Sequence, residues 1–160
     1  RQVAADAVVR PDIGWAIFPD AFRDELIALS QRYKLPIHVT ENGCGSVDTP
    51  NASGEVRDPG RMAYLETYTA AMHDAIRAGA DVRGYFVWSL LDSFEWGSGY
   101  TNPFGLVHVD FETLKRTPKA SARWYADFIE QARNGRTGAR AAAASLQRRS
   151  VTNRSTRTTS

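Results

Sequence analysis

Two short apolar runs in this 160-residue chain have the pattern of buried β-strands. The first, residues 36–43, reads Pro-Ile-His-Val-Thr-Glu-Asn-Gly, and the second, residues 84–92, reads Gly-Tyr-Phe-Val-Trp-Ser-Leu-Leu-Asp. Nearly continuous apolar character is typical of strands that are covered on both faces, as in parallel sheets. We therefore predict two parallel strands, each of which runs into polar residues.

Helical periodicity precedes the first strand and separates it from the second. A helix with Pro19 in its first turn is predicted to bury one face, made of Phe22, Leu26, Leu29 and Tyr33. A second helix, residues 61–78, is predicted to stop at Gly79 and to bury Leu65, Tyr68, Met72 and Ile76. Because a helix joins the two strands, the connection should be a right-handed βαβ crossover.

The remaining segments are assigned from their turn-forming and alternating residues. Residues 43–60 are rich in Gly, Pro, Asp, Asn and Ser, so we expect a long surface loop there. Residues 105–111 alternate and are followed by a turn at Glu112, which predicts a short hairpin. Thr117 is predicted to be the N-cap of a final helix, with Pro118 at its first position.

Charge divides the chain into two parts. Residues 133–160 hold seven of the 20 Lys and Arg and none of the 18 Asp and Glu, which leaves residues 1–132 with 13 basic against 18 acidic residues. We predict that residues 133–160 form a disordered tail rich in Arg, Ala, Ser and Thr. A basic tail can contact nucleic acid or an anionic membrane, but no aromatic residue is interleaved and no helical face collects the charges. We therefore predict neither a nucleic-acid nor a membrane partner.

The cysteine and histidine content points to no metal or cofactor. Cys44 is alone, and His38, His73 and His108 form no cluster with the spacing of a zinc site, which needs about four ligands. The chain also has no apolar leader pattern and no transmembrane run, so a cytoplasmic location is the expectation.

The candidate catalytic and binding residues lie where the two predicted strands end. Glu41 ends the first, and Glu95 and Trp96 follow the second. Sheet enzymes keep their reactive groups at the carboxyl ends of strands. A carboxylate beside an indole suits sugar recognition, because the acid accepts hydrogen bonds from hydroxyls and the ring covers the C–H face of a pyranose. Taken alone, however, a glutamate beside a glycine turn is more often a solvated loop residue.

Four motifs resemble, in their order and spacing, the carboxyl-terminal third of glycoside hydrolase family 1, the β-glucosidases and their relatives. They are Thr-Glu-Asn-Gly at 40–43, Trp-Ser-Leu-Leu-Asp at 88–92, Phe-Glu-Trp at 94–96 and Arg-Thr-Pro-Lys-Ala-Ser at 116–121. The resemblance runs from about residue 11 to about residue 132. It implies an α/β fold that forms the last two strand–helix units of a (β/α)8 TIM barrel, within a catalytic domain portion spanning residues 1–132.

The resemblance also implies a role for each site residue. Glu41 would be the nucleophile of a retaining β-glycosidase acting on a β-glucoside or related oligosaccharide, in carbohydrate catabolism. Glu95 would bind hydroxyls, although two carboxylates by themselves would fit an acid and a nucleophile equally well. Trp88 and Trp15 each have core packing as an alternative. The full set of predicted substrate-binding residues is Trp88, Glu95, Trp96, Asn42, Phe104 and Trp15.

The general acid of the family lies in an Asn-Glu-Pro motif, and this sequence has none. A (β/α)8 barrel also needs roughly 250 residues, whereas only two strand–helix units are visible here. We therefore expect a barrel fragment with little or no activity alone, whose partner is the missing amino-terminal part of the barrel. The alternative is a catalytically inactive sugar-binding or assembly module.

Overall fold

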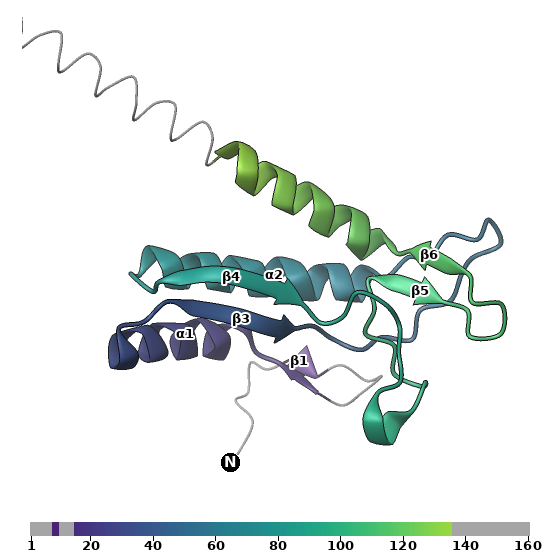
Figure 1. Ribbon diagram of the computed structural model, residues 1–160, viewed down its shortest axis with the longest axis horizontal. Helices are drawn as coiled ribbons and strands as arrows, with labels where there is room; N and C mark the ends of the chain where they lie inside the picture. Colours follow the sequence, from purple (N-terminus) through teal and green to yellow (C-terminus); the bar gives the residue numbers. More distant parts are fainter. Residues whose placement is uncertain (1–7, 10–14, 136–160) are drawn as a thin grey trace, which may run out of the picture. The chain divides into compact units, whose positions relative to one another are not determined.

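The structure is a computed structural model that describes residues 8–9 and 15–135 (Figure 1). Its strands are β1 (Val8–Val9), β2 (Ala16–Ile17), β3 (Ile37–Asn42), β4 (Val82–Val87), β5 (Val107–Val109) and β6 (Arg116–Pro118). Its helices are α1 (Pro19–Tyr33), α2 (Pro59–Arg77), the short 3-10 helix η1 (Trp96–Ser98) and a helix over residues 120–135. The described residues up to Arg123 form one compact unit, and the rest of the last helix belongs to a second.

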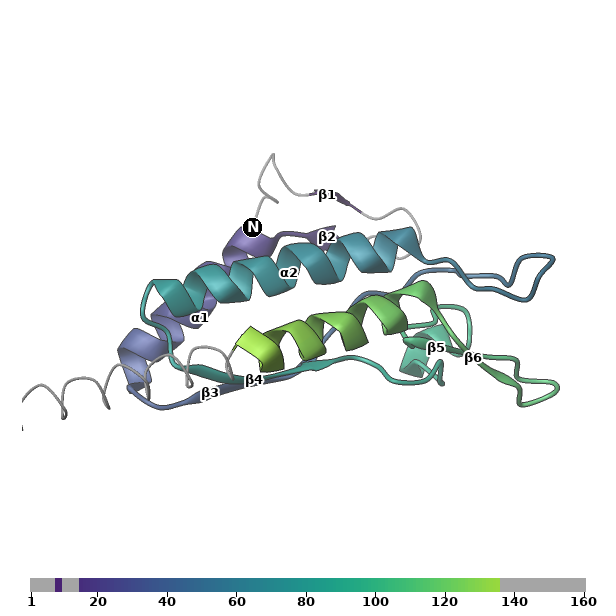
Figure 2. The ribbon, with the colours of Figure 1, turned by 90° about the horizontal axis from the view of Figure 1, so that it is seen from above.

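β3 and β4 form the predicted parallel pair. Ile37 lies beside Val82 and Val39 beside Tyr85, with α2 in the connection between the strands. Figure 2 shows α1 and α2 on the same side of these strands. The core on that side is built around Leu26, Ala75 and Ala80, against which Ile37, Val39, Val82, Phe22, Ile27 and Met72 pack.

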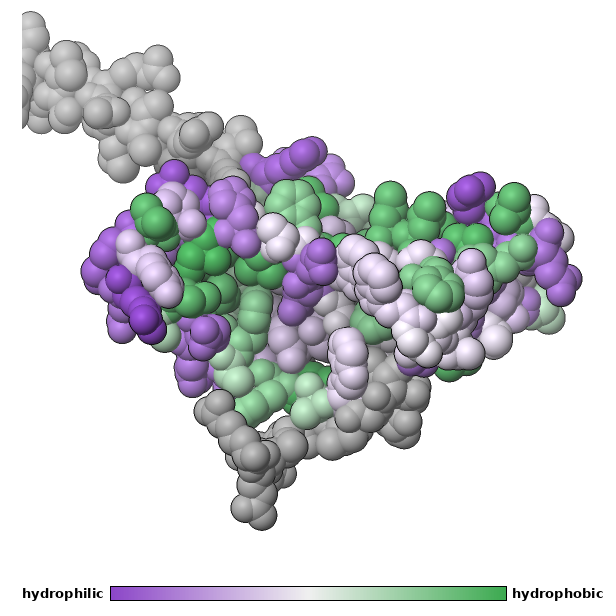
Figure 3. All heavy atoms as spheres, turned by 60° about the horizontal axis from the view of Figure 1, so that its bottom comes forward, coloured by the Kyte–Doolittle hydropathy of each residue, from purple (hydrophilic) through white to green (hydrophobic). Residues whose placement is uncertain are grey.

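The other face of the β3–β4 pair is exposed in the described part of the chain. Residues alternate between faces along a strand, so His38 and Thr40 point away from the helices, and both are exposed. Phe86 of β4 lies on the same face, because its ring and the His38 imidazole both approach Gly84, and it is 59% exposed. Coverage on both faces of the strands was expected, but no described element covers this face. Figure 3 shows apolar residues between hydrophilic ones on the surface of the molecule.

The helix predictions hold with two exceptions in the buried stripes. Tyr33, predicted on the buried face of α1, is 57% exposed at the carboxyl end of that helix. Leu65 and Tyr68 of α2 are buried, but Ile76 is 41% exposed because Ala75 takes the inward position beside it. Gly79 lies just past the helix with φ +98°, a left-handed conformation that suits glycine, and its N–H donates to the Ile76 carbonyl.

The segment around Thr117 differs from the prediction. β6 pairs antiparallel with β5, so Thr117 lies opposite His108 in the expected hairpin and does not cap a helix. The last helix begins at residue 120 and receives its cap from elsewhere, since the Ser121 N–H donates to the Asp58 carboxylate at 2.9 Å. This helix reaches residue 135, past the predicted start of the tail, and residues 136–160 lie outside the described part.

The composition of residues 43–60 predicted a surface loop, but the loop between β3 and α2 is partly buried. Its buried side chains include Asp48, Val56 and Asp58. Asp48 and Asp58 both accept hydrogen bonds from the guanidinium of Arg61, which explains how acidic side chains enter the interior. Burial opposes the charge on Arg61, but the carboxylates outweigh it and raise the pKa of Arg61 above its usual value.

Among the described residues, none of the helices combines the length and the apolar character that a membrane crossing requires.

The ends of β3 and β4 approach so closely at Gly43 that only glycine fits. A Cβ atom at residue 43 would lie 1.7 Å from the carbonyl oxygen of Trp88 and 2.8 Å from its carbonyl carbon. We expect Gly43→Ala to lower the free energy of unfolding by about 1 to 3 kcal/mol, because backbone atoms must separate. Urea denaturation followed by circular dichroism measures the change.

Gly97→Ala is the matched control, since a Cβ atom there meets no heavy atom within 4 Å. Its expected effect is below about 0.5 kcal/mol. Equal destabilisation by the two substitutions would contradict the prediction.

Candidate active site

The carboxyl ends of β3 and β4 open onto a cavity of about 720 Å³. Parallel strands bring these ends to the same edge, so residues distant in sequence meet there. The cavity brings together all seven predicted site residues, namely Trp15, Glu41, Asn42, Trp88, Glu95, Trp96 and Phe104.

Glu41 and Asn42 form the last part of β3 and are tied to β4. The Asn42 carbonyl accepts a hydrogen bond from the Trp88 N–H at 3.0 Å. The Asn42 side-chain oxygen accepts another from the Tyr85 hydroxyl at 2.7 Å, which fixes the plane of the amide. Glu41 is exposed, so its carboxylate is open to a ligand in the cavity.

Aromatic rings form much of the cavity wall. Trp15 is 62% exposed and Trp88 is 38% exposed, so neither is the packed core residue that the sequence left as an alternative. Phe104 is buried, and its ring centroid lies 5.7 Å from that of Trp15. The peptide bond between Trp88 and Ser89 is cis. Open indole faces can stack on the C–H face of a sugar ring.

Glu95 and Trp96 lie on a tight loop that contains η1. The Glu95 N–H donates to the Gly99 carbonyl at 2.7 Å, and the Ser93 hydroxyl donates to the Glu95 carboxylate at 3.3 Å. Trp96 is 86% exposed, so its indole is available to a ligand. Tyr100 of the same loop is not in the cavity lining and packs against Phe94 and Phe111, with ring centroids at 5.5 and 4.5 Å.

Tyr64 is a cavity residue that the sequence analysis missed. It comes from α2, is buried and stacks on Tyr68 with ring centroids 4.1 Å apart. Burial, assisted by Tyr68 and Tyr85, raises the pKa of Tyr64, so its hydroxyl stays protonated and able to donate. The helical period was the available signal, because Tyr64 lies one turn before the correctly predicted Tyr68. The other missed lining residues are Gly43, Gly97, Ser98 and Asn102.

The chemistry of the cavity is that of carboxylates, amides and aromatic rings. In the described part of the chain, Glu41 and Glu95 are the carboxylates of the lining. The same part contains no group of three or more His, Cys, Asp and Glu side chains able to hold a metal ion. The arrangement can bind a polyhydroxylated ring and offer a carboxylate to it.

Sequence comparison identifies curated relatives that are much longer than this chain. The "Probable inactive beta-glucosidase 14" of Oryza sativa subsp. japonica is 47% identical over 114 residues, which cover 69% of this chain and 22% of the relative. "Beta-glucosidase A" of Acetivibrio thermocellus is 41% identical over 122 residues, which cover 76% of this chain and 27% of the relative. The chain thus spans about a quarter of the length of these curated relatives.

Comparison with solved structures also identifies β-glucosidases of which the chain covers only part. A psychrophilic β-glucosidase from Micrococcus antarcticus matches with a TM-score of 0.76 and 44% identity, over 80% of this chain and 28% of the other. A family 1 β-glucosidase from Thermotoga maritima in complex with isofagomine lactam matches with a TM-score of 0.76 and 37% identity, over 80% and 29%. Residues 2–134 match the family described as Glycosyl hydrolase family 1, and the chain therefore belongs to that family.

Proposed function

We propose that this chain carries the nucleophile and part of the sugar-binding site of a retaining β-glycosidase of the β-glucosidase type. The substrates are terminal β-D-glycosyl residues, in carbohydrate catabolism. The observation that carries the proposal is that Glu41, Glu95 and three tryptophans line the same cavity. The tryptophans are Trp15, Trp88 and Trp96. The relatives named as β-glucosidases, and the one solved with isofagomine lactam, support this choice of substrate class.

In the proposed mechanism, the ionised carboxylate of Glu41 attacks the anomeric carbon and forms a glycosyl-enzyme ester as the aglycone leaves. Water then hydrolyses the ester and releases the sugar with retained configuration. Glu95 accepts hydrogen bonds from sugar hydroxyls, and Trp88 and Trp96 cover the ring. Contacts to hydroxyls that strengthen as the ring flattens lower the barrier as well as improving binding.

The proposal assigns β3 and β4 to the last two strand–helix units of a (β/α)8 barrel. Its general acid has to come from the remainder of such a barrel, because the sequence has no Asn-Glu-Pro motif. The exposed face of the β3–β4 pair is the surface that the remaining strands would cover. On this proposal the partner of the 160-residue chain is that amino-terminal part.

A catalytically inactive sugar-binding or assembly module is the second candidate function. One observation favours it, namely that the 47% identical rice relative is named as probably inactive. The two candidates share the sugar site and differ in whether Glu41 reacts.

Covalent labelling tests the nucleophile. We expect the chain to gain one sugar adduct from 2,4-dinitrophenyl 2-deoxy-2-fluoro-β-glucoside, because this leaving group departs without help from an acid. Intact-protein mass spectrometry detects the adduct, and peptide mapping should locate it on Glu41.

Glu41→Gln is expected to abolish the adduct, whereas Glu55→Gln, a carboxylate outside the cavity, should leave it unchanged. An adduct on Glu95, or one that survives in Glu41→Gln, contradicts the assignment of the nucleophile. A folded chain that binds sugar without labelling would favour the inactive module.

Turnover tests the missing acid. We expect the chain to hydrolyse p-nitrophenyl β-glucoside at least 10²-fold more slowly than the intact Micrococcus antarcticus enzyme, since a general acid contributes about 10²- to 10⁴-fold. Release of p-nitrophenol under matched conditions measures the difference. Comparable rates would show that this chain needs no further acid, contrary to the proposal.

A further inference from the structure

Five charged side chains are buried together beside the loop that carries Glu95 and Trp96. We call Asp48, Asp58, Arg61, Asp92 and Lys119 the charged cluster. They come from four separate stretches of the chain: the loop after β3, the start of α2, the loop after β4 and the residue that follows β6. The proposed mechanism uses none of them.

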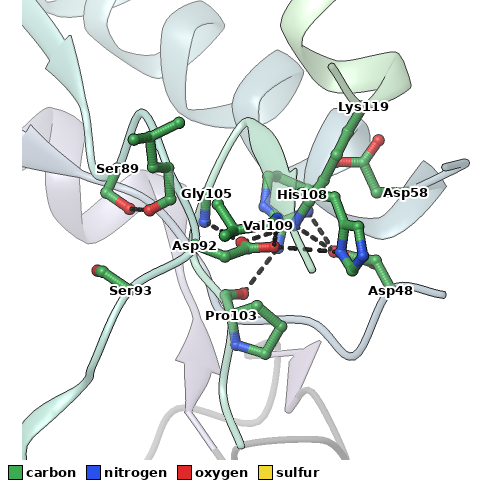
Figure 4. A network of polar contacts seen from close by, with 12 residues as sticks. Asp48, Asp58, Ser89, Asp92, Ser93, Pro103, Gly105, His108, Val109 and Lys119 are labelled. Carbon is green, nitrogen blue, oxygen red and sulfur yellow. Dashed lines mark hydrogen bonds and ion pairs between the residues drawn. The ribbon is translucent and has the colours of Figure 1, made fainter. Parts of the chain in front are cut away.

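Shared oxygens connect the cluster (Figure 4). The Lys119 ammonium donates to the Asp92 Oδ1 at 2.9 Å and to the Asp48 Oδ2 at 3.1 Å. The same Asp48 oxygen accepts from the Arg61 guanidinium, which also donates to Asp58 at 2.7 Å. The Arg61 and Lys119 side chains are both 0% exposed, so water screens neither cation.

The charged cluster holds both ends of the loop of residues 93–102. At its entry, the Asp92 Oδ1 accepts the Gly105 N–H at 2.8 Å. At its exit, the Pro103 carbonyl accepts from the Arg61 Nη2 at 2.9 Å and from the Ser46 N–H at 3.1 Å. The two ends also touch directly, because a Cβ atom at residue 105 would lie 2.2 Å from the Asp92 nitrogen.

Between these ends no residue of the loop is buried, and Tyr100 packs against Phe111 outside the loop. Asp92, Phe104 and Gly105 are buried, whereas no residue from 93 to 103 is. The direction in which Glu95 and Trp96 project therefore depends on how the two ends are held as well as on the Tyr100–Phe111 contact.

A gain in the stability of the fold is a weak explanation for the burial of these five charged side chains. Replacing a buried ion pair with apolar residues of similar volume is often neutral or stabilising, because desolvation offsets the Coulomb attraction. Fixed geometry is the stronger reason, since a binding site needs its contact residues held to within about 0.5 Å.

We propose that Lys119 and Arg61 are positioning residues, which act through Asp92 and Pro103 to orient Glu95 and Trp96 toward the sugar. The identity of the ligand as a sugar rests on the proposed function. The orientation of the loop by Lys119 and Arg61 does not depend on that function.

The test is ¹⁹F NMR of the full 160-residue chain labelled with 5-fluorotryptophan. Its four tryptophans give separate probes, and Trp96→Phe assigns the resonance of residue 96. Lys119→Met keeps the length of the side chain and removes its charge. We expect the Trp96 resonance to shift or broaden in this variant while the Trp15 resonance stays in place.

Two further variants separate positioning from stability. Ser121→Ala removes the hydrogen bond that the hydroxyl donates to Asp58, inside the same network but away from the loop, and should leave the Trp96 resonance unchanged. Asp92→Asn keeps an oxygen for the Gly105 N–H and removes the charge that Lys119 neutralises. Combined with Lys119→Met, it should leave the Trp96 resonance displaced, because the contact between Lys119 and residue 92 is still missing, whereas a return to the original position would assign the shift to the uncompensated charge of Asp92 and overturn the proposal.

The proposal is overturned if Lys119→Met lowers the free energy of unfolding and leaves the Trp96 resonance unchanged. It is equally overturned if Ser121→Ala moves that resonance as much. Should Lys119→Met fail to fold, the single variant Asp92→Asn decides, because it weakens the hold of Lys119 on the loop without a change of volume. An unchanged Trp96 resonance there overturns the proposal.

The labelling rate gives a second readout. Lys119→Met, with Glu41 intact, should slow adduct formation by the fluoroglucoside at least tenfold. If the unsubstituted chain forms no adduct, the proposed function fails in this chain while the ¹⁹F spectra still decide the positioning.

Discussion

Parallel pairing of β3 with β4 is the constraint on which the candidate site depends. Parallel strands place both carboxyl ends at one edge, so Glu41 and Trp88 become neighbours although 46 intervening residues separate them in the chain. The pairing has a steric requirement at that edge, where Gly43 meets the Trp88 carbonyl. It also links the side chains, because the Tyr85 hydroxyl of β4 holds the Asn42 amide of β3.

The β3–β4 sheet has two strands, and one of its faces has no cover among the described residues. A parallel pair is normally covered on both sides. Here α1 and α2 cover one side, while His38, Thr40 and Phe86 remain exposed on the other. The chain spans about a quarter of its relatives, so most of the length of those proteins has no counterpart in it.

Local patterns predicted the elements that local interactions determine. The apolar runs predicted β3 and β4, and the helical period predicted α1 and α2, because each of these signals lies within the sequence of the element itself. Thr117 and Pro118 were misassigned because their local signal for a helix start is overridden by pairing with β5, which a local rule does not see. Asp48 was expected at the surface for the same reason, since its partner Lys119 is 71 residues away. Tyr64 was missed because a helix position shows which face is buried but not what it lines.

Asp58 links two helices that are far apart in sequence. Its main-chain carbonyl accepts the Arg61 N–H at the start of α2, while its carboxylate accepts the Ser121 N–H at the start of the last helix. One residue thus accepts a main-chain N–H at each of two helix starts. Fraying of either start exposes a buried carboxylate shared with the other. The two helix starts are thereby coupled in local unfolding.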